Sequence, residues 1–334
     1  MKVDAGITWE LDKAGDEARE LEEMGYAGLK SAETSHDPFL PLLMASQTTS
    51  SIDLITGISV AFGRTPMALA YMAHDINAAS KGRLIVGLGS QIRPHITKRY
   101  SMPWSAPAAR MREFVLALRA IWACWYEEKP LEFLGKFYTH TLMTPFFTPT
   151  NTEYGAPKIY LAAVGPRMTE VAGEVADGLL VHGFTTEAYL RETTLPALER
   201  GFAKAGRSRG DFEIVYPVFS VTGRDEKELK ASDTKMRQQV AFYGSTPAYK
   251  PVLDSIGAGE LQPELNAMSK QGRWEAMGEL ISDDVLAKFA VAGGPKELAG
   301  QIRARYGDLV DRTGMSYATL GRDGRIEFIE AMRG

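Results

Sequence analysis

The chain has 334 residues, of which 45% are hydrophobic and 24% charged, and its formal net charge is −4. This hydrophobic fraction excludes a largely disordered chain. The excess of 42 acidic over 38 basic residues argues against a nucleic-acid partner. A single cysteine, Cys124, excludes an internal disulfide and a multi-cysteine metal site. Because no segment reads as a signal peptide or a membrane span, we expect a cytoplasmic protein without a membrane partner.

Short apolar segments alternate with amphipathic segments along the chain. The segment 52–62 is apolar at both odd and even positions, which is typical of a parallel strand buried on both faces. Predicted strands cover 3–7, 27–31, 52–62, 83–89, 158–164, 178–182, 212–222 and 317–320. Predicted helices cover 12–24, 39–50, 66–80, 106–127, 166–176, 186–204 and 323–332, and two more begin after Asp225 and Gly294.

The count of about eight strand–helix units predicts a (β/α)8 TIM barrel formed by one domain, residues 1–334. Three stretches do not fit the repeat and are expected to be insertions at the C-terminal face: about 90–105, 129–150 and 243–273. The second is expected to form a hairpin. The third is either a lid or an ordered insertion, and we expect it to cover the mouth of the barrel and select the substrate.

In this fold the site lies just after the strands, so polar residues at those positions are candidates. Glu33 and His36 follow the second strand and could exchange a proton, although Asp37 could simply cap the next helix. Gly57 interrupts an apolar strand, which indicates either close approach of a ligand or packing against a large neighbour. Trp9, after the first strand, fits a substrate pocket or the core equally well.

An anion site is predicted after the fifth strand. Gly165 and Pro166 open a helix whose first N–H groups are free, and Arg167 would oppose the helix dipole unless an anion bound nearby. The alternative is that Arg167 is a solvated surface arginine. His182 ends the sixth strand and could face the mouth. The histidines share no ligand spacing, so no metal site is expected, and Cys124 lies within a helix as core filler.

Several stretches together resemble the luciferase-like monooxygenase superfamily, and within it the F420-dependent oxidoreductases. The resemblance extends over nearly the whole chain. It is carried by the segments 33–39 (ETSHDPF), 56–62 (TGISVAF), 79–89 (ASKGRLIVGLG), 162–166 (AAVGP) and 176–178 (ADG).

The resemblance implies a (β/α)8 barrel that binds a flavin or deazaflavin at the C-terminal ends of its strands. It implies a non-prolyl cis peptide at Gly57–Ile58 that supports the ring of the coenzyme. It implies that Val164, Gly165, Pro166 and Arg167 hold the coenzyme phosphate. Further contacts to the ring and side chain are implied for Ser90, Gln91 and His95. Because members are often dimers, the resemblance also implies a homodimer.

The leading hypothesis is an F420-dependent oxidoreductase that transfers a hydride between the deazaflavin and a small organic substrate. In it, His36 or Glu33 exchanges the accompanying proton, and Trp9 and His182 belong to the substrate pocket. One alternative is an FMN-dependent monooxygenase that uses reduced flavin and oxygen. Another is a barrel that binds a flavin without turnover, since Ile92 stands where some sugar-phosphate dehydrogenases of the family carry an acid.

Overall fold

The computed structural model of the protein describes residues 1–316 and 320–334. Most strands occur where the apolar segments predict them, with ends shifted by a residue or two. The strands are β1 (Lys2–Gly6), β2 (Gly28–Ser31), β3 (Asp53–Thr56), β4 (Ser59–Val60), β5 (Leu84–Gly89), β6 (Phe133–Leu134), β7 (Thr139–His140), β8 (Lys158–Ala163), β9 (Gly178–Val181), β10 (Glu213–Val221), β11 (Ala290–Ala292) and β12 (Arg312–Ser316).

The last barrel strand is the main difference from the predicted elements. The strand expected at 317–320 falls mainly on residues 317–319, which lie outside the described residues. The strand found in this region is β12, which the sequence pattern does not indicate because it contains an arginine and a glycine and no apolar run. Arg312 is nevertheless completely buried.

The strands form a (β/α)8 barrel, as predicted. Their hydrogen-bonded order is β11-β10-β12-β1-β2-β3-β5-β8-β9, β4 pairs with β5, and β9 also pairs with β10. Every ladder of this sheet whose register is described is parallel. Parallel strands joined by helices bring their carboxyl ends to one edge of the sheet, where ligands bind in this fold.

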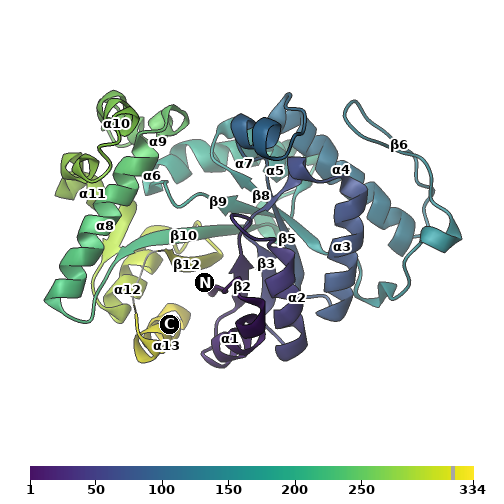
Figure 1. The fold of residues 1–334 in the computed structure, drawn as a ribbon, viewed down its shortest axis with the longest axis horizontal. Helices are drawn as coiled ribbons and strands as arrows, with labels where there is room; N and C mark the ends of the chain where they lie inside the picture. The colour runs from purple at the N-terminus through teal and green to yellow at the C-terminus, as the bar shows by residue number, and fades with distance from the viewer. Residues whose placement is uncertain (317–319) are drawn as a thin grey trace. The chain divides into compact units, whose positions relative to one another are not determined.

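Helices follow the strands in nearly every predicted place (Figure 1). They are α1 (Leu11–Glu23), α2 (Phe39–Thr48), α3 (Pro66–Ala79), α4 (Pro107–Tyr126), α5 (Pro166–Val175), α6 (Glu187–Tyr189), α7 (Leu195–Ala205), α8 (Glu226–Gly244), α9 (Lys250–Asp254), α10 (Leu261–Lys270), α11 (Asp283–Phe289), α12 (Pro295–Tyr306) and α13 (Arg322–Arg333).

The starts of α3 and α8 show why the positions of helix N-termini can be predicted from the sequence. Thr65 is extended and its hydroxyl accepts the amide of Ala68, while Pro66 occupies the first helical position of α3. Asp225 caps α8 in the same way, accepting the amide of Glu228 at 2.8 Å. Capping needs only nearby residues, so it can be recognised without knowledge of the fold.

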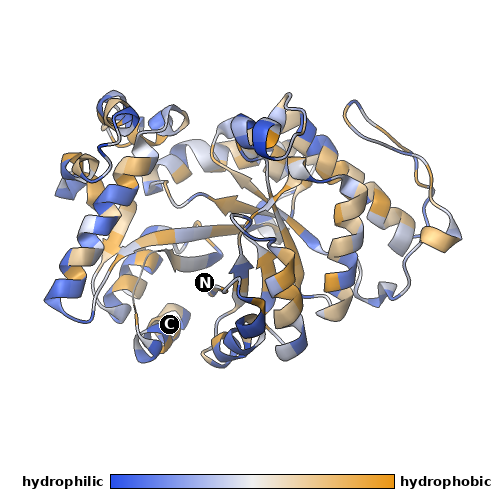
Figure 2. Cartoon of the chain, in the orientation of Figure 1, coloured by the Kyte–Doolittle hydropathy of each residue, from blue (hydrophilic) through white to orange (hydrophobic). Residues whose placement is uncertain are grey.

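The described residues pack into two compact units. The N-terminal unit contains Asp4–Leu180 and Ala197–Glu213, and the C-terminal unit contains Met1–Val3, Val181–Pro196 and Ile214–Gly334. The core of the N-terminal unit is built from strands such as β3 and β5, which Figure 2 shows as mainly hydrophobic. All six residues of β5 are buried.

The stretch 243–273 in the C-terminal unit is an ordered helical insertion, which was one of the two alternatives for it. It contains α9 and α10. A separate core holds the insertion on α8: Val240 and Met236 of α8 are buried among Leu253, Leu265 and Met277. The sequence pattern did not reveal these two helices, because α9 has only five residues and glycines lie in the segments that flank α9 and α10.

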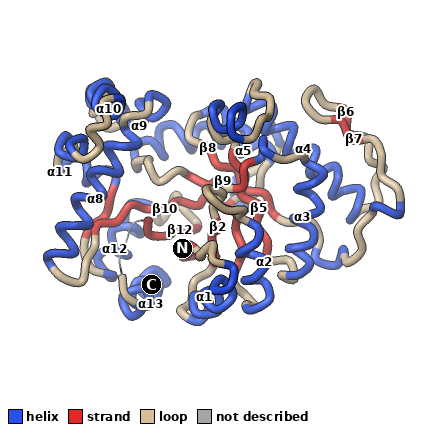
Figure 3. The backbone as a smooth tube through the Cα atoms, in the orientation of Figure 1, coloured by secondary structure: helices blue, strands red, loops and turns tan. Residues whose placement is uncertain are grey.

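The stretch 129–150 in the N-terminal unit contains the predicted hairpin. It consists of the antiparallel pair β6 and β7, with Phe133 opposite His140. Each of these strands has two residues, and the rest of the stretch is loop and short 3-10 turns (Figure 3).

Among the helices in the described ranges, none combines the length and the apolar character that crossing a bilayer requires.

Candidate functional site

Five adjacent strands carry most of the predicted site residues at their carboxyl ends. These strands are β1, β2, β3, β5 and β8, in that order in the sheet. Trp9 follows β1, Glu33 and His36 follow β2, Gly57 and Ile58 follow β3, Ser90, Gln91 and His95 follow β5, and Val164, Gly165, Pro166 and Arg167 follow β8. The topology therefore places these residues along one edge of the sheet. His182 follows β9 and lies in the C-terminal unit.

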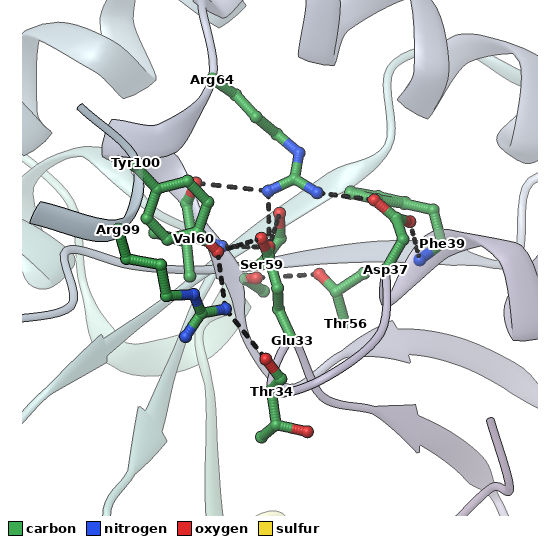
Figure 4. Close-up of polar contacts among 11 residues, drawn as sticks. Glu33, Thr34, Asp37, Phe39, Thr56, Ser59, Val60, Arg64, Arg99 and Tyr100 are labelled. Carbon is green, nitrogen blue, oxygen red and sulfur yellow. Dashed lines mark hydrogen bonds and ion pairs between the residues drawn. The ribbon is translucent and has the colours of Figure 1, made fainter. Parts of the chain in front are cut away.

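Glu33 lies in a buried ion-pair network rather than open to solvent (Figure 4). One guanidinium nitrogen of Arg64 lies 2.5 Å from Oε2 of Glu33, and the other lies 2.7 Å from Oδ2 of Asp37. The amide of Val60 also donates to Oε2 of Glu33, at 2.8 Å. Arg64 thus bridges two carboxylates of the loop between β2 and α2.

Tyr100 completes this network from the segment after β5. Its hydroxyl donates to Oε1 of Glu33 at 2.5 Å, and burial together with that hydrogen bond raises the pKa of the Tyr100 phenol. The neighbouring Arg99 donates to the carbonyl of Thr34 at 2.9 Å. The loops after β2, β4 and β5 are therefore tied to one another by charged and polar side chains.

Sequence reasoning missed Arg64 and Tyr100 as members of the site. Arg64 and its partner Glu33 are 31 residues apart in the chain, and Tyr100 and Glu33 are 67 apart. A pairing over such separations follows from the barrel topology and not from local spacing. The one signal in the sequence was a charged residue directly before the predicted helix start at Thr65.

His36 is exposed and stacks on Trp9. The ring centroids are 5.6 Å apart and the planes differ by 9°. Asp37 accepts the amide of Phe39 at 2.8 Å, so the capping interaction that the sequence suggested is present. The residues of this loop therefore have different surroundings. Glu33 and Asp37 bind Arg64, whereas the imidazole of His36 is exposed to solvent beside the exposed indole of Trp9.

The peptide bond between Gly57 and Ile58 is cis, which confirms the prediction made from the resemblance. A Cβ atom on Gly57 would meet only the Lys30 side chain, at an ordinary 3.6 Å. Packing within the described structure therefore does not require glycine there. Gly87 differs, because a Cβ atom on it would lie 1.9 Å from the carbonyl oxygen of Thr56. Gly87 thus allows β5 to pack closely against β3, which argues against a role for this glycine in a phosphate-binding loop.

The loop after β5 presents polar groups at the same edge. Gln91 adopts a left-handed conformation with φ of 56°, and the Ser90 hydroxyl donates to its carbonyl at 3.1 Å. A short helical turn, His95–Arg99, follows, and His95 is half-buried. The position at which some family members carry an acid is occupied here by Ile92, whose side chain is 58% exposed.

The start of α5 has the features of an anion site. Gly165 is exposed, and a Cβ atom on it would meet nothing within 4 Å. The first turn of a helix leaves amide N–H groups without intrahelical acceptors, and here they belong to Arg167 and Met168. Arg167 is exposed, and its guanidinium pairs with no group among the described residues. This donor set fits a phosphate.

His182 of the C-terminal unit lies among aromatic rings. It stacks on Tyr249 at 5.0 Å between ring centroids and meets Tyr243 edge-on at 4.7 Å. Its Nδ1 accepts the amide of Phe184 at 3.0 Å, so the neutral ring carries its proton on Nε2. Burial lowers the pKa of His182 to about 4. At neutral pH this imidazole is an uncharged hydrogen-bond donor.

The low pKa of His182 predicts a loss of stability in mild acid. In the unfolded chain His182 regains its ordinary pKa of 6.5, so the unfolded state takes up the proton first as the pH falls. Between pH 7 and pH 5 this one group should lower the free energy of unfolding by about 2 kcal/mol. Urea unfolding at both pH values should show a smaller loss in the His182→Phe variant, and an equal loss in both proteins would contradict the prediction.

The fold is a (β/α)8 barrel whose candidate site lies at the carboxyl ends of its strands. Residues 4–312 match the family described as luciferase-like monooxygenase. The chain belongs to the luciferase-like monooxygenase family, as its sequence resemblance suggested.

Individual relatives include proteins of bacteria and archaea. An uncharacterized protein of Mycobacterium tuberculosis is 53% identical over 312 residues, which cover 93% of this chain and 92% of that protein. A 5,10-methylenetetrahydromethanopterin reductase of Archaeoglobus fulgidus is 28% identical over 269 residues, which cover 78% of this chain and 75% of the relative.

Among solved structures, the chain is similar to the coenzyme F420-dependent tetrahydromethanopterin reductase of Methanopyrus kandleri. The TM-score is 0.76 at 20% identity, and the match covers 98% of this chain and 96% of that chain. At this identity the likeness shows the shared fold, which is the predicted TIM barrel.

Proposed function

We propose that the protein is an F420-dependent oxidoreductase that transfers a hydride between the deazaflavin and a small organic substrate. The observation that carries the proposal is the open start of α5, where Gly165 leaves space and Arg167 has no partner among the described residues. A similar solved structure is that of an F420-dependent reductase, which favours a deazaflavin as the coenzyme. The coenzyme supplies the hydride chemistry when it is bound.

The residues of the N-terminal unit then have separate tasks. Arg167 and the free amides of α5 bind the phosphate, and Val164, Gly165 and Pro166 shape the backbone around it. Gly57 and Ile58 support the ring from the end of β3, where no packing contact demands a glycine.

The loop after β5 offers further contacts to the coenzyme. Ser90, Gln91 and His95 are half-buried and lie between β3 and β8 in the strand order. We propose that they contact the ring and the side chain of the coenzyme.

We propose His36, and not Glu33, as the group that exchanges the proton. The Glu33 carboxylate is buried and accepts hydrogen bonds from Arg64, Val60 and Tyr100, so it has little capacity left for a reacting proton. The His36 imidazole is exposed on the same loop. Its stack on Trp9 holds the ring in one orientation and gives the site an aromatic surface for a substrate.

The substrate class follows from the chemistry of the side chains. An imidazole that exchanges a proton beside a hydride donor suits the interconversion of alcohols with aldehydes or ketones, and the reduction of enones. His182 presents a neutral N–H donor that suits a carbonyl or hydroxyl oxygen, and we propose that it contacts the substrate. We also propose that the helical insertion of the C-terminal unit helps to select the substrate.

The family description favours a second candidate, an FMN-dependent monooxygenase that uses reduced flavin and oxygen. Titration of the apoprotein with F420 and with FMN, followed by fluorescence, separates the two. We expect tighter binding of F420, and a clear preference for FMN would overturn the leading proposal. Tight F420 binding without hydride transfer to a panel of alcohols, aldehydes and enones would indicate a binding protein instead.

The anion site predicts a loss of coenzyme affinity in the Arg167→Ala variant. A hydrogen bond to a charged group contributes about 1.5 to 3 kcal/mol. Its loss should therefore increase the dissociation constant for F420 roughly 10- to 150-fold. The fluorescence titration measures it directly. Arg273→Ala is the control, because Arg273 is an exposed arginine of the C-terminal unit. Unchanged affinity in Arg167→Ala would remove Arg167 from the phosphate site.

A further inference from the structure

A groove of the C-terminal unit runs along one face of α8, the long green helix that leads to α9 and α10 in Figure 1. Its volume is about 890 Å³, which is within the range of sites that hold small molecules. Side chains of α8 from Glu228 to Phe242, three or four residues apart, form most of its lining, and Arg224, Trp274 and Glu275 supply the rest. None of these residues is among those proposed above for the coenzyme or the substrate.

The segment that carries Trp274 is fixed to α8 by close packing. It continues into the 3-10 turn Ala276–Leu280, whose Met277 is completely buried in the core shared with α8. Gly278 permits this close approach, because a Cβ atom on it would lie 3.0 Å from Cγ of Gln238. The groove is therefore formed by the folded chain itself and does not depend on a ligand for its shape.

Two large aromatic side chains of the groove are only half covered by protein. Trp274 and Phe242 are each 49% exposed, and their ring centroids lie 5.8 Å apart with the planes tilted by 53°. Aromatic side chains usually bury most of their large apolar surface in a core or an interface. An indole that is held in place but half open offers a flat surface on which another planar ring can stack.

Two adjacent glutamines of the groove supply hydrogen-bonding groups of both kinds. Gln238 and Gln239 are half-buried, and their carboxamides have no hydrogen-bond partner among the described residues. A carboxamide carries N–H donors and a carbonyl acceptor side by side. This pair matches the neighbouring acceptor and donor on the edge of a purine such as adenine. The groove thus combines a stacking surface with groups that can recognise the edge of the stacked ring.

The charges of the groove cancel one another. Nε of Arg224 donates to Oε2 of Glu228 at 3.0 Å, and hydrogen bonds from Arg224 lower the pKa of Glu228 to about 2. Lys235 and Glu275 have no ion-pair partner among the described residues and contribute one charge of each sign. A groove without net charge favours a ligand without net charge over a phosphate ester or a carboxylate.

We infer that this groove binds a neutral purine nucleoside, whose base stacks on Trp274 and whose edge hydrogen-bonds to the carboxamides of Gln238 and Gln239. A purine meets both features of the lining, because it has a flat aromatic face and polar atoms along its edge. A sugar alone has no aromatic face for the indole. Because the two sites share no residue, nucleoside binding here does not depend on the use of F420.

Calorimetric titration of the full chain with adenosine tests the inference. We expect one site per chain, with a dissociation constant that rises roughly 5- to 150-fold in Trp274→Ala, as the loss of one base–aromatic stack predicts. Gln239→Leu keeps the size of the side chain but removes its carboxamide, and should raise the constant roughly 2- to 10-fold. Trp9→Ala is the matched control, because Trp9 is also an exposed tryptophan but belongs to the N-terminal unit.

Far-ultraviolet circular dichroism verifies the folding of each variant, and Trp274→Gln replaces Trp274→Ala if the latter is unfolded. Absence of adenosine binding to the wild type overturns the inference, as does a dissociation constant that either groove variant leaves unchanged. Loss of binding in Trp9→Ala would place the nucleoside elsewhere and would also overturn it. So would binding of glucose in place of adenosine. The F420 titration is unaffected by Trp274→Ala if the two sites are separate, so each proposal can fail without the other.

Discussion

Replacing Arg64 with methionine is expected to lower the free energy of unfolding by about 3 to 5 kcal/mol, because it leaves a buried carboxylate without its counter-charge. The Arg64 and Glu33 side chains are only 16% and 7% exposed. Methionine keeps an apolar chain near the Phe39 ring, over which the guanidinium now lies at 5.7 Å. Urea unfolding followed by tryptophan fluorescence measures the loss.

Two further variants separate the charge effect from packing. In the double variant Arg64→Met/Glu33→Gln the uncompensated charge is removed, so part of the lost stability should return. Arg19→Met is the surface control, since Arg19 and Asp16 form an ion pair in which both side chains are at least half exposed. A loss in Arg64→Met no larger than in Arg19→Met would show that the network contributes little.

Glu33 is a candidate for proton exchange from its position after β2, but the ion-pair network gives its carboxylate a structural role instead. Its carboxylate accepts hydrogen bonds from Val60 of β4, from Arg64 in the loop after β4 and from Tyr100 in the loop after β5. Those two loops lie beside Gly57 and Ser90, which are proposed to contact the coenzyme. We therefore propose that Arg64 holds the loop after β2 in place and does not itself exchange the proton.

Much of the fold could be predicted because its signals are local. Strands buried on both faces, such as β5, read as continuous apolar runs, and helix starts such as Thr65-Pro66 require only neighbouring residues. The strand β12 could not be predicted, because its partner strands β1 and β10 lie far away in the chain and its arginine is completely buried.

The candidate site was predictable only in part for the same reason. The resemblance identified Gly57–Ile58, and the cis peptide bond there is confirmed. No local pattern could show that Arg64 binds Glu33 and Asp37 at once, or that Trp9 stacks on His36. These contacts join loops that follow adjacent strands of the sheet, and which strands are adjacent is known only once the barrel has formed.

Replacing His36 with alanine is expected to lower kcat by about 100- to 10,000-fold, which is the usual contribution of a positioned acid or base. The affinity for F420 should stay within about twofold, because the proposed coenzyme contacts lie on other loops. The assay follows the absorbance of F420 with the best substrate from the panel of alcohols, aldehydes and enones.

His36→Phe is the decisive companion variant. It keeps an aromatic ring that can stack on Trp9, as the imidazole does at 5.6 Å, but it cannot carry a proton. If His36 exchanges the proton, His36→Phe is as slow as His36→Ala and keeps the wild-type affinity for F420. If the ring acts only by stacking, His36→Phe recovers the turnover that His36→Ala loses, and the proton must then be exchanged by another group or by water. Since the Glu33 carboxylate is already engaged by Arg64 and Tyr100, that result would favour water.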